Sequence, residues 1–247
     1  MANNDVVFMP TNRRVRLEFN GRIVIDSTRA MLLMEGGLHP AYFFPKEDVP
    51  AVLLKKSPET KSSPYLGEAR SWSLTDGERL ATNAVWAFES PPPGMPPVAR
   101  YVTVAWDTGR WFEEDKEIFG HARNPFRRVD CIKSTRRVEV FLGGQRVADS
   151  RRAVFLFETG MIPRYYIPKD DVAPNVTLIP TDKHTYCPYK GTASYYSAVL
   201  DGTTYENIVW YYPEPVPESS RIAGLVAFYN EKVDEILLDG APAPKMA

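Results

Sequence analysis

Residues 184–197 read HTYCPYKGTASYYS, a stretch that combines a thiol, a lysine, a proline and glycine that set a turn, and an alternating aromatic segment. An upstream stretch, KSSPYLGEARSWS at residues 61–73, repeats the Pro-Tyr-x-Gly turn and the segment after it. Ser63 stands where the later stretch has Cys187, and Leu66 stands where it has Lys190. The chain therefore carries one motif twice, and only the second copy keeps the reactive side chains.

The two stretches belong to a repeat that covers most of the 247 residues. A shift of 123 positions places VRLEFNGRIVIDSTRA (15–30) over VEVFLGGQRVADSRRA (138–153), and a shift of 124 places ATNAVWAFESP (81–91) over YENIVWYYPEP (205–215). A repeat of this length indicates two domains of one fold, because solenoid units span only roughly 20 to 50 residues. We predict a first repeat over residues 1–116, a docked connector over 117–135 and a second repeat over 136–247.

Each repeat is predicted to be mainly antiparallel β. Asn20-Gly21 and Gly143-Gly144 interrupt alternating apolar residues and suit tight hairpin turns, because both positions tolerate positive φ. About one helix per repeat is expected, and in the second repeat it covers residues 219–233, where a serine caps apolar residues at helical spacing. The equivalent residues of the first repeat, 98–106, are rich in β-branched side chains, which make a helix there less favourable.

Composition narrows the class of protein. The formal net charge of −1 gives no electrostatic case for nucleic acid, which needs clustered Lys and Arg. Two cysteines, Cys131 and Cys187, are too few for a disulfide framework, so we expect reduced thiols in a cytoplasmic protein. We find no signal-peptide pattern and no apolar run of about 18 residues in the sequence, so we expect no membrane partner. With two thiols, three histidines and no CxxC pair, we expect no metal and no cofactor, and the oligomeric state stays open.

Several segments carry a resemblance to a known family: FETGMIPRYYIPKDDV (157–172), CPYKGTASYYS (187–197), ENIVWYYPEP (206–215), RIAGLVAFYNEKVD (221–234) and the connector WFEEDKEIFGHARNPFRRVD (111–130). Together they resemble the tandem-repeat members of a widespread domain of unknown function that is catalogued under a nucleotidyltransferase label. The resemblance implies coiled antiparallel sheets, akin to the Mss4-like or β-tent arrangement, without the zinc cysteines usual in that group. It implies little about the reaction.

Nucleotidyl transfer on the usual plan requires a glycine-rich turn and paired carboxylates that hold Mg²⁺. The sequence has no Gly-Gly or Gly-Ser turn followed by an alternating Asp-x-Asp, and no phosphate-binding loop of the GxxxxGK type. This activity is therefore kept as an alternative.

Residues that differ between the repeats indicate where function has separated from fold. Lys190, Cys187 and Glu206 differ in type from their counterparts, and we treat them as catalytic candidates. A lysine in a turn between tyrosines presents an ammonium to a carbonyl, carboxylate or phosphate, and a partly desolvated thiol or carboxylate accepts protons. Simpler interpretations are a solvated lysine, a small buried thiol and a surface carboxylate. Glu158 recurs as Glu35, which favours a structural cap or ion pair.

The remaining candidates are predicted to bind the substrate: Arg164, Tyr166, Tyr189, Tyr196 and Trp210 in the second repeat, with His121 and Arg123 on the connector. Some of these aromatic residues are expected to fill the core instead. We predict a small-molecule enzyme with an aromatic-lined pocket in the second repeat and non-redox acid/base chemistry of the isomerase, cyclase or hydrolase type. The alternatives are a nucleotidyltransferase, as the family label suggests, and a non-catalytic small-molecule-binding protein.

Overall fold

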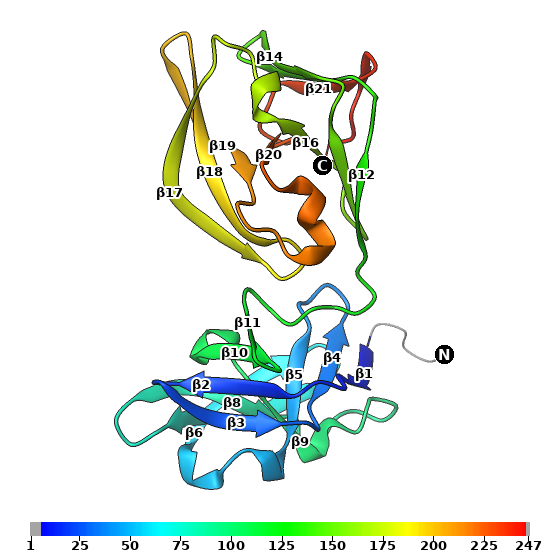
Figure 1. Ribbon diagram of the computed structural model, residues 1–247. Coiled ribbons are helices and arrows are strands. Elements are labelled where there is room, and N and C mark those ends of the chain that lie inside the picture. Colours follow the sequence, from blue (N-terminus) through cyan, green and yellow to red (C-terminus); the bar gives the residue numbers. More distant parts are fainter. Residues whose placement is uncertain (1–5, 246–247) are drawn as a thin grey trace. The chain divides into compact units, whose positions relative to one another are not determined.

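The computed structural model describes residues 6–245 and divides the chain into two units, Met1–Asn124 and Pro125–Ala247 (Figure 1). Each unit consists of a seven-stranded and a four-stranded antiparallel sheet. The prediction of two tandem, mainly β domains is confirmed. Among the described residues, no helix has the length and apolar character needed to cross a membrane.

In the first unit the sheet orders are β1-β4-β5-β9-β8-β7-β6 and β11-β10-β2-β3. The strands are β1 (Val6–Pro10), β2 (Val15–Phe19), β3 (Arg22–Ser27), β4 (Met31–Glu35), β5 (Ala41–Pro45), β6 (Leu54–Ser63), β7 (Gly67–Thr75), β8 (Leu80–Ala87), β9 (Tyr101–Val104), β10 (Arg110–Glu113) and β11 (Lys116–Ile118). Short 3-10 helices lie at Lys46–Asp48 (η1), Ala51–Leu53 (η2), Val98–Arg100 (η3) and Trp106–Thr108 (η4).

In the second unit the orders are β12-β15-β16-β20-β19-β18-β17 and β14-β13-β21-β22. The strands are β12 (Val129–Lys133), β13 (Val138–Leu142), β14 (Gln145–Ser150), β15 (Val154–Glu158), β16 (Arg164–Pro168), β17 (Thr177–Cys187), β18 (Gly191–Leu200), β19 (Thr203–Tyr211), β20 (Leu225–Phe228), β21 (Glu235–Leu238) and β22 (Ala241–Pro242), with 3-10 helices at Lys169–Asp171 (η5) and Pro217–Ile222 (η6). The seven-stranded orders correspond strand for strand between the units. In Figure 1 the large sheet of the second unit coils so far that β17 and β12 lie on opposite sides of that unit.

The predicted hairpin turns are confirmed. Asn20 and Gly21 join β2 to β3 with φ values of 51° and 76°, and Gly143 and Gly144 join β13 to β14 with φ values of 59° and 74°. Both central positions therefore take the left-handed conformation that a tight turn of this kind requires.

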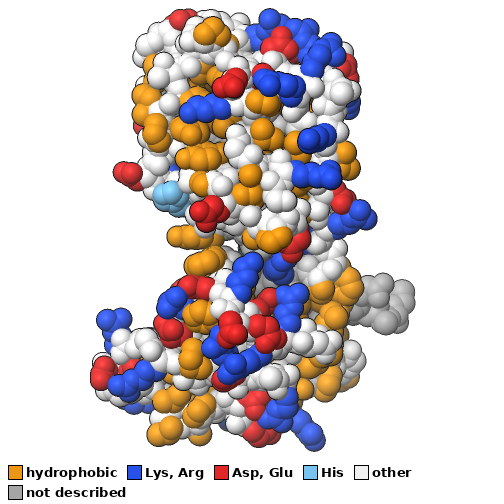
Figure 2. All heavy atoms as spheres, in the orientation of Figure 1, with side chains coloured by type: hydrophobic (Ala, Val, Ile, Leu, Met, Phe, Trp, Pro, Cys, Tyr) orange, Lys and Arg blue, Asp and Glu red, His pale blue; other side chains and the backbone are white. Residues whose placement is uncertain are grey.

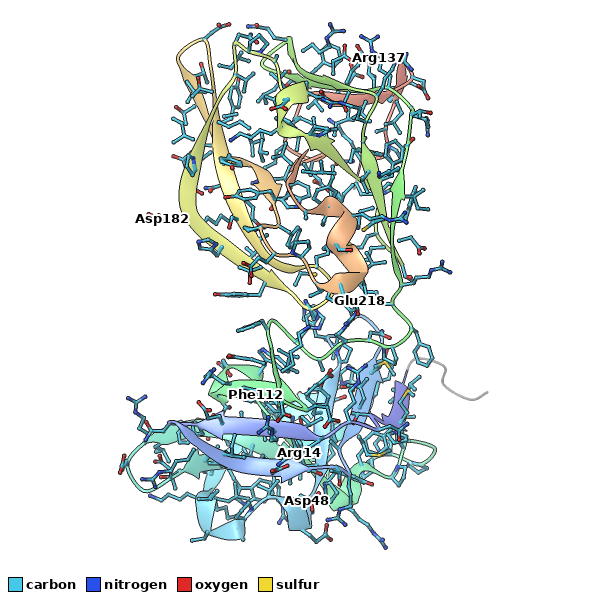
Figure 3. All side chains as sticks on the ribbon, in the orientation of Figure 1. Arg14, Asp48, Phe112, Arg137, Asp182 and Glu218 are labelled. Atoms are coloured by element: carbon cyan, nitrogen blue, oxygen red, sulfur yellow. The ribbon has the colours of Figure 1, made fainter. Side chains whose placement is uncertain are left out.

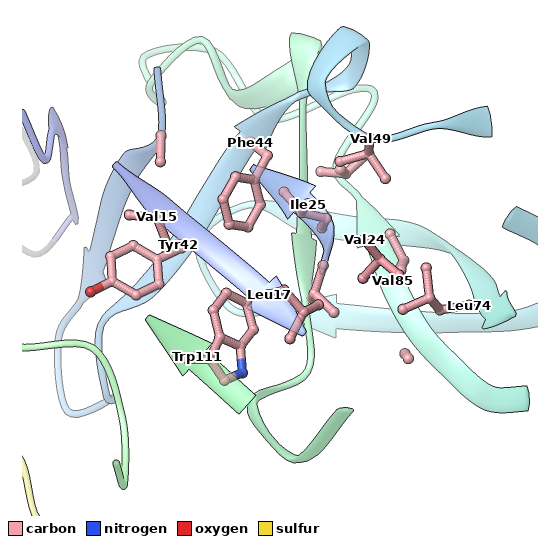
Figure 4. Packing of buried hydrophobic residues seen from close by; sticks show 14 of the residues in the cluster. Val15, Leu17, Val24, Ile25, Tyr42, Phe44, Val49, Leu74, Val85 and Trp111 are labelled. Atoms are coloured by element: carbon pink, nitrogen blue, oxygen red, sulfur yellow. The ribbon is translucent and has the colours of Figure 1, made fainter. Parts of the chain in front are cut away.

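Each seven-stranded sheet buries both faces. In the first unit, Tyr42 and Phe44 of β5 belong to the cluster that packs between the two sheets, whereas Phe43 belongs to a second cluster on the opposite face. Figure 4 shows Phe44 in the first of these clusters, with Leu17 of β2 and Trp111 of β10 beside it. The second unit repeats this division, with Tyr165 in one cluster and Tyr166 in the other.

Charged side chains on the outer face of the first unit's small sheet are paired. Arg14 binds Asp26, and the guanidinium carbons of Arg16 and Arg110 each lie 5.3 Å from the centre of the Phe112 ring (Figure 3). Figure 2 shows basic and acidic side chains interspersed on this face. In the second unit Arg137 binds Asp149 in the position equivalent to Arg14 and Asp26.

The long edge strands of the large sheets are interrupted. In β17 the register with β18 shifts between Pro180 and His184, and in β6 the register with β7 shifts between Lys56 and Thr60. Asp182 lies in the interrupted part of β17 with an exposed side chain (Figure 3). Neither edge is therefore a continuous ladder along its whole length.

The helix predicted over residues 219–233 is wrong in extent. Only Pro217–Ile222 is helical, as a 3-10 helix, and Leu225–Phe228 forms strand β20, which pairs with β16 and β19. Val226 packs into one core cluster and Ala227 into the other, so this strand is apolar on both faces. A short apolar run of that kind cannot be told from a buried helix by periodicity.

The segment expected to connect the domains, residues 117–135, is divided between the units. Its first residues belong to β11, which pairs with β10, and Val129–Lys133 forms β12, which pairs with β15. The division between the units falls between Asn124 and Pro125.

Candidate functional site

A cavity of about 180 Å³ opens in the second unit, on the face of the large sheet turned away from the small one. It is lined by Leu156, Glu158, Met161, Ile162, Arg164, Tyr166, Lys190, Tyr195, Trp210, Tyr212 and Tyr229. An apolar cavity of about 150 Å³ holds a benzene ring. The space therefore suits a ligand of one ring with a small substituent.

Strand alternation brings these side chains to one face. Leu156 of β15 is paired with Arg164 of β16, and Tyr195 of β18 is paired with Trp210 of β19. Residues two positions along the same strands, such as Glu158 and Tyr166, point the same way. The sequence patterns of β15 and β16, and of β18 and β19 on the other side of β20, thus converge on the cavity.

The turn between β17 and β18 places Lys190. The Lys190 backbone N–H donates to the Cys187 carbonyl at 3.2 Å, and the Val216 N–H donates to the Lys190 carbonyl at 3.1 Å. Gly191 follows with φ of 104°, and a Cβ atom there would lie 3.0 Å from the Glu214 carbonyl oxygen. Only glycine allows the next strand to leave the turn so close to that backbone.

Lys190 forms an ion pair with Glu158, and both side chains are largely buried, with 14% and 8% exposure. The second oxygen of Glu158 accepts a hydrogen bond from Arg127 Nη1 at 2.8 Å. Burial acts to raise the pKa of Glu158, but the charges and hydrogen bonds of Lys190 and Arg127 outweigh it and hold that pKa below its ordinary value. Glu158 is therefore an anion with both oxygens occupied.

Tyr212 has a hydroxyl that this network leaves without a hydrogen-bond partner. Tyr212 is 4% exposed and lines the cavity, and its hydroxyl makes no hydrogen bond to any other residue in the described range 6–245. It is not among the fully buried unpartnered oxygens of the unit, Tyr165 Oη and Asn230 Oδ1, so the Tyr212 oxygen keeps some accessible surface. Burial raises its pKa strongly, and Tyr166, Cys187, Tyr195 and Glu158 add to the shift in that order, so the hydroxyl lies close to these groups. A buried hydroxyl needs a partner, and the cavity is where one would sit.

The other aromatic hydroxyls are bonded to each other or to neighbours. The Trp210 indole N–H donates to the Tyr166 hydroxyl at 2.9 Å, and burial raises the pKa of Tyr166. Tyr229 donates to Tyr195 at 3.3 Å, and Tyr195 shares a further hydrogen bond with Thr185 at 2.7 Å. These bonds hold the rings that form the walls.

Arg164 closes one side of the site. Both terminal nitrogens donate to Glu231, at 2.9 and 2.6 Å, and the guanidinium carbon lies 5.7 Å from the Trp210 ring centre. The hydrogen bonds from Arg164 hold the pKa of Glu231 below its ordinary value although burial opposes them. This pair is charge-balanced.

The equivalent position in the first unit is apolar. Glu35, the counterpart of Glu158, accepts a hydrogen bond from Ser63, and Leu66, the counterpart of Lys190, is fully buried. Phe43 and Phe88 replace Tyr166 and Tyr212 and pack with Leu66 in one hydrophobic cluster. The polar groups of the cavity are thus specific to the second repeat.

Four of the residues predicted for the site, Lys190, Arg164, Tyr166 and Trp210, line this cavity. Cys187 is half-buried next to it, close enough to Tyr166 and Tyr212 to add to the rise of their pKa values, and it forms no disulfide. Tyr189 is buried in the same turn, and its ring lies 5.8 Å from the Arg127 guanidinium carbon. It is not part of the lining.

Glu206 and Tyr196 of the second unit do not line the cavity, and His121 and Arg123 belong to the first unit. Glu206 is exposed in the first part of β19, outside the buried run of Ile208, Val209 and Trp210. Tyr196 faces the opposite side of β18 from Tyr195 and stacks on Tyr211 with ring centres 4.7 Å apart. His121 stacks on His39 within the first unit at 4.0 Å, and Arg123 lies near Tyr42 in that unit.

Glu158, Tyr195, Tyr212 and Tyr229 line the cavity but were not among the predicted site residues. Glu158 recurs as Glu35, so its identity alone does not mark it as a site residue, although the two carboxylates have different partners. The signal for Tyr212 was present in the comparison of repeats, where a phenylalanine stands at its counterpart position. Within residues 6–245, no group of three or more His, Cys, Asp or Glu side chains is arranged to hold a metal ion.

Comparison with known protein families gives a match for each of the two repeats. A family model described as a domain of unknown function (DUF427), under a nucleotidyltransferase label, matches residues 7–115 and again residues 130–239. The two matches correspond to the two repeats and together cover well over half of the chain. No curated protein gave a significant match.

Proposed function

The chain belongs to the DUF427 family as a two-repeat member, and from that premise we propose that its second repeat is a small-molecule enzyme with non-redox acid/base chemistry. The site is the cavity between Lys190, Tyr212 and the aromatic walls. The reaction class is isomerisation, cyclisation or hydrolysis, in which protons move and no electrons are exchanged with a cofactor.

The observation that carries the proposal is that two hydrogen-bond donors, the Lys190 ammonium and the unpartnered Tyr212 hydroxyl, line one largely buried cavity. Lys190 gives one hydrogen bond to Glu158, so two of its ammonium hydrogens are available to a ligand. Tyr212 offers its hydroxyl, whose raised pKa keeps it protonated. Donors fixed in a site of low dielectric stabilise negative charge that develops on a substrate oxygen in the transition state. This stabilisation is the largest single contribution to the rate enhancement of many enzymes.

Proton transfer requires an acceptor as well. Glu158 is poorly suited, since both of its oxygens are occupied and its pKa is held low. Cys187, which lies in the same turn as Lys190 but does not itself line the cavity, is the remaining candidate, and it acts as a base or nucleophile only as the thiolate. We assign it that role, with Lys190 and Tyr212 as the groups that stabilise the resulting oxyanion.

The test is exchange of the α-hydrogens of small 2-oxo and 3-oxo acids with D₂O, followed by proton NMR. We expect exchange with the native chain, a loss of about 100-fold or more in Tyr212→Phe, as for removal of one oxyanion donor, and loss in Cys187→Ser. Lys183→Met is the control, because Lys183 lies 4.6 Å from the Tyr195 ring centre without lining the cavity. Full exchange in Tyr212→Phe and Cys187→Ser would contradict the assigned roles.

A non-catalytic binding protein is the first alternative. The same donors and aromatic walls would hold a ligand without turning it over. Under this alternative, Tyr212→Phe and Lys190→Leu weaken affinity, and no substrate of the panel exchanges hydrogen in the native chain.

Nucleotidyl transfer, which the family label suggests, is the second alternative. The cavity of about 180 Å³ is smaller than the roughly 300 to 1,000 Å³ of pockets that enclose drug-sized ligands, so a nucleoside triphosphate would lie mostly outside it. Calorimetric titration with the common triphosphates and Mg²⁺ tests this activity, and heat that depends on both would favour it.

A further inference from the structure

We infer that the ligand of this cavity is a small monoanion: a carboxylate carried on a flat, unsaturated group. The inference rests on the proposed function and names its substrate class. Three features support it, namely the charge of the ion-pair network, the direction of its free hydrogen-bonding groups and the shape of the walls.

The network around Glu158 carries one excess positive charge. Lys190 and Arg127 are both bonded to this single carboxylate, whereas Arg164 is balanced by its own partner, Glu231. Of the three charged residues in this network, Lys190 and Glu158 line the cavity and Arg127 does not. The Lys190 side chain is only 14% exposed, so solvent screens its charge weakly. A monoanion bound there would neutralise the network.

The hydrogen-bonding groups that face the cavity are donors. Lys190 has two ammonium hydrogens left after its bond to Glu158, and Tyr212 has its hydroxyl. Each oxygen of Glu158 accepts a hydrogen bond from a cationic side chain, so the negative charge of the strongest acceptor in the lining is already compensated. A carboxylate uses this arrangement fully, whereas an ammonium ligand would place its donors against other donors.

The walls fit a flat group. Trp210 lies 4.5 Å from Tyr229 and 6.1 Å from Tyr166, measured between ring centres, and the Tyr166 ring stands nearly perpendicular to it. Aromatic walls also attract cations, so wall chemistry alone does not select the sign of the ligand. The excess charge and the donor set decide it.

The experiment compares three probes of one shape: benzoate, neutral benzamide and cationic benzylamine. Binding to the full chain is measured by calorimetry and by the NMR signal of the Trp210 indole N–H. The other four tryptophans, Trp72, Trp86, Trp106 and Trp111, lie in the first unit and provide unchanged reference signals. We expect benzoate to bind at least about tenfold more tightly than benzamide and benzylamine not to bind, since charge-assisted hydrogen bonds are roughly twice as strong as neutral ones.

Three variants test the assignment of the groups. Tyr212→Phe, which copies Phe88 of the first repeat, is expected to weaken benzoate about tenfold, the effect of one hydrogen bond to a charged group. Lys190→Leu, which copies Leu66 of the first repeat, removes both the excess positive charge and the two remaining ammonium donors and should abolish the preference of benzoate over benzamide. Lys133→Met removes a positive charge of the same unit outside the lining and should leave the preference intact.

The outcomes separate the inference from the proposed function. Benzamide or benzylamine binding as tightly as benzoate, with a shifted Trp210 signal, overturns the monoanion inference and leaves the cavity as the site. Failure of all three probes to shift the Trp210 signal at 10 mM, roughly the limit for fragment-sized ligands, overturns the inference and counts against the site itself. Benzoate selectivity without hydrogen exchange in any oxo acid supports the inference and favours the binding protein over the enzyme.

Discussion

The two glutamates at equivalent positions, Glu158 and Glu35, show how one residue is reused in different surroundings. Glu158 is held by Lys190 and Arg127, whereas Glu35 accepts a hydrogen bond from the Ser63 hydroxyl. A carboxylate that is buried with two cations loses far more when one partner is removed than a carboxylate that loses one hydroxyl. The strand position is conserved between the repeats, and the chemistry around it is not.

This difference is measurable as a double-mutant cycle. We expect Lys190→Leu and Glu158→Gln each to lower the free energy of unfolding of the second unit by about 2 kcal/mol, because each takes one charged partner away from a largely buried ion. The double variant should lose less than the sum, since the two changes remove one shared interaction. The measurement is urea unfolding followed by the Trp210 NMR signal.

The matched control is Glu35→Gln in the first unit, for which we expect about 1 kcal/mol or less. Strict additivity of the two second-unit changes would show that the ion pair contributes nothing to stability.

Glu158 also predicts a dependence of stability on pH. Its folded-state pKa is below the ordinary value of 4.5, so the stability it contributes is fully present above that value and is lost as pH falls through the folded-state pKa. Asp149, Asp171 and Asp239 in the same unit have lowered pKa values too, so the native curve is a sum of several groups. The difference between the native chain and Glu158→Gln isolates the contribution of Glu158.

We therefore expect the stability advantage of the native chain over Glu158→Gln to be constant near pH 6 and to shrink below about pH 4.5. Unfolding free energies measured from pH 6 to pH 3 check this expectation. An advantage that grows on acidification would contradict the lowered pKa.

At the scale of the element, the turn between β17 and β18 controls where Lys190 lies. Gly191→Ala places a methyl group 3.0 Å from the Glu214 carbonyl oxygen at a φ of 104°, so the turn or the facing backbone must move. We expect a loss of stability of about 2 kcal/mol and a displaced Lys190, combining a steric clash with backbone strain. Crystallography or NMR of the variant, together with unfolding, measures both effects.

Gly202→Ala in the next turn is the control. Gly202 also has positive φ, at 77°, but no atom lies within 4 Å of the Cβ position, so only backbone strain of about 1 kcal/mol is expected. Equal effects of the two substitutions would show that the contact with Glu214 is not limiting.

Hairpins and the repeat were predictable from sequence because they depend on local rules. Asn20-Gly21 and Gly143-Gly144 specify their turns through the φ values that those residues tolerate. Strand β20 was not predictable, because Leu225–Phe228 is buried on both faces and its spacing satisfies a helix equally well. The competition was decided by pairing with β16 and β19, which are distant in sequence.

The candidate site was predictable where the two repeats differ in residue type. Lys190 and Arg164 stand opposite apolar residues of the first repeat and do line the cavity. Glu206 differs as well, yet it lies in the exposed first part of β19, before the buried run of Ile208, Val209 and Trp210. Glu158 shows the converse limit, since an unchanged residue acquired new partners that its own identity does not reveal.

At the scale of the whole molecule, each unit has its own pair of sheets and its own core clusters. We expect residues 125–247, expressed alone, to fold and to keep the benzoate affinity of the full chain within about threefold, because every lining residue belongs to that unit. Circular dichroism and calorimetry check folding and binding. A fragment that folds but does not bind would show that the first repeat contributes to the site.

The interrupted edge strands have a consequence for how this protein behaves at high concentration. An uninterrupted edge of ten or more residues is a template on which a second chain can add a strand and start a fibril. In β17 the shift between Pro180 and His184, with the charged Asp182 and Lys183 inside it, breaks that template, and Pro58 lies in the corresponding break of β6. Both repeats thus interrupt their longest open edge close to a proline, so neither edge presents an unbroken template to a second chain.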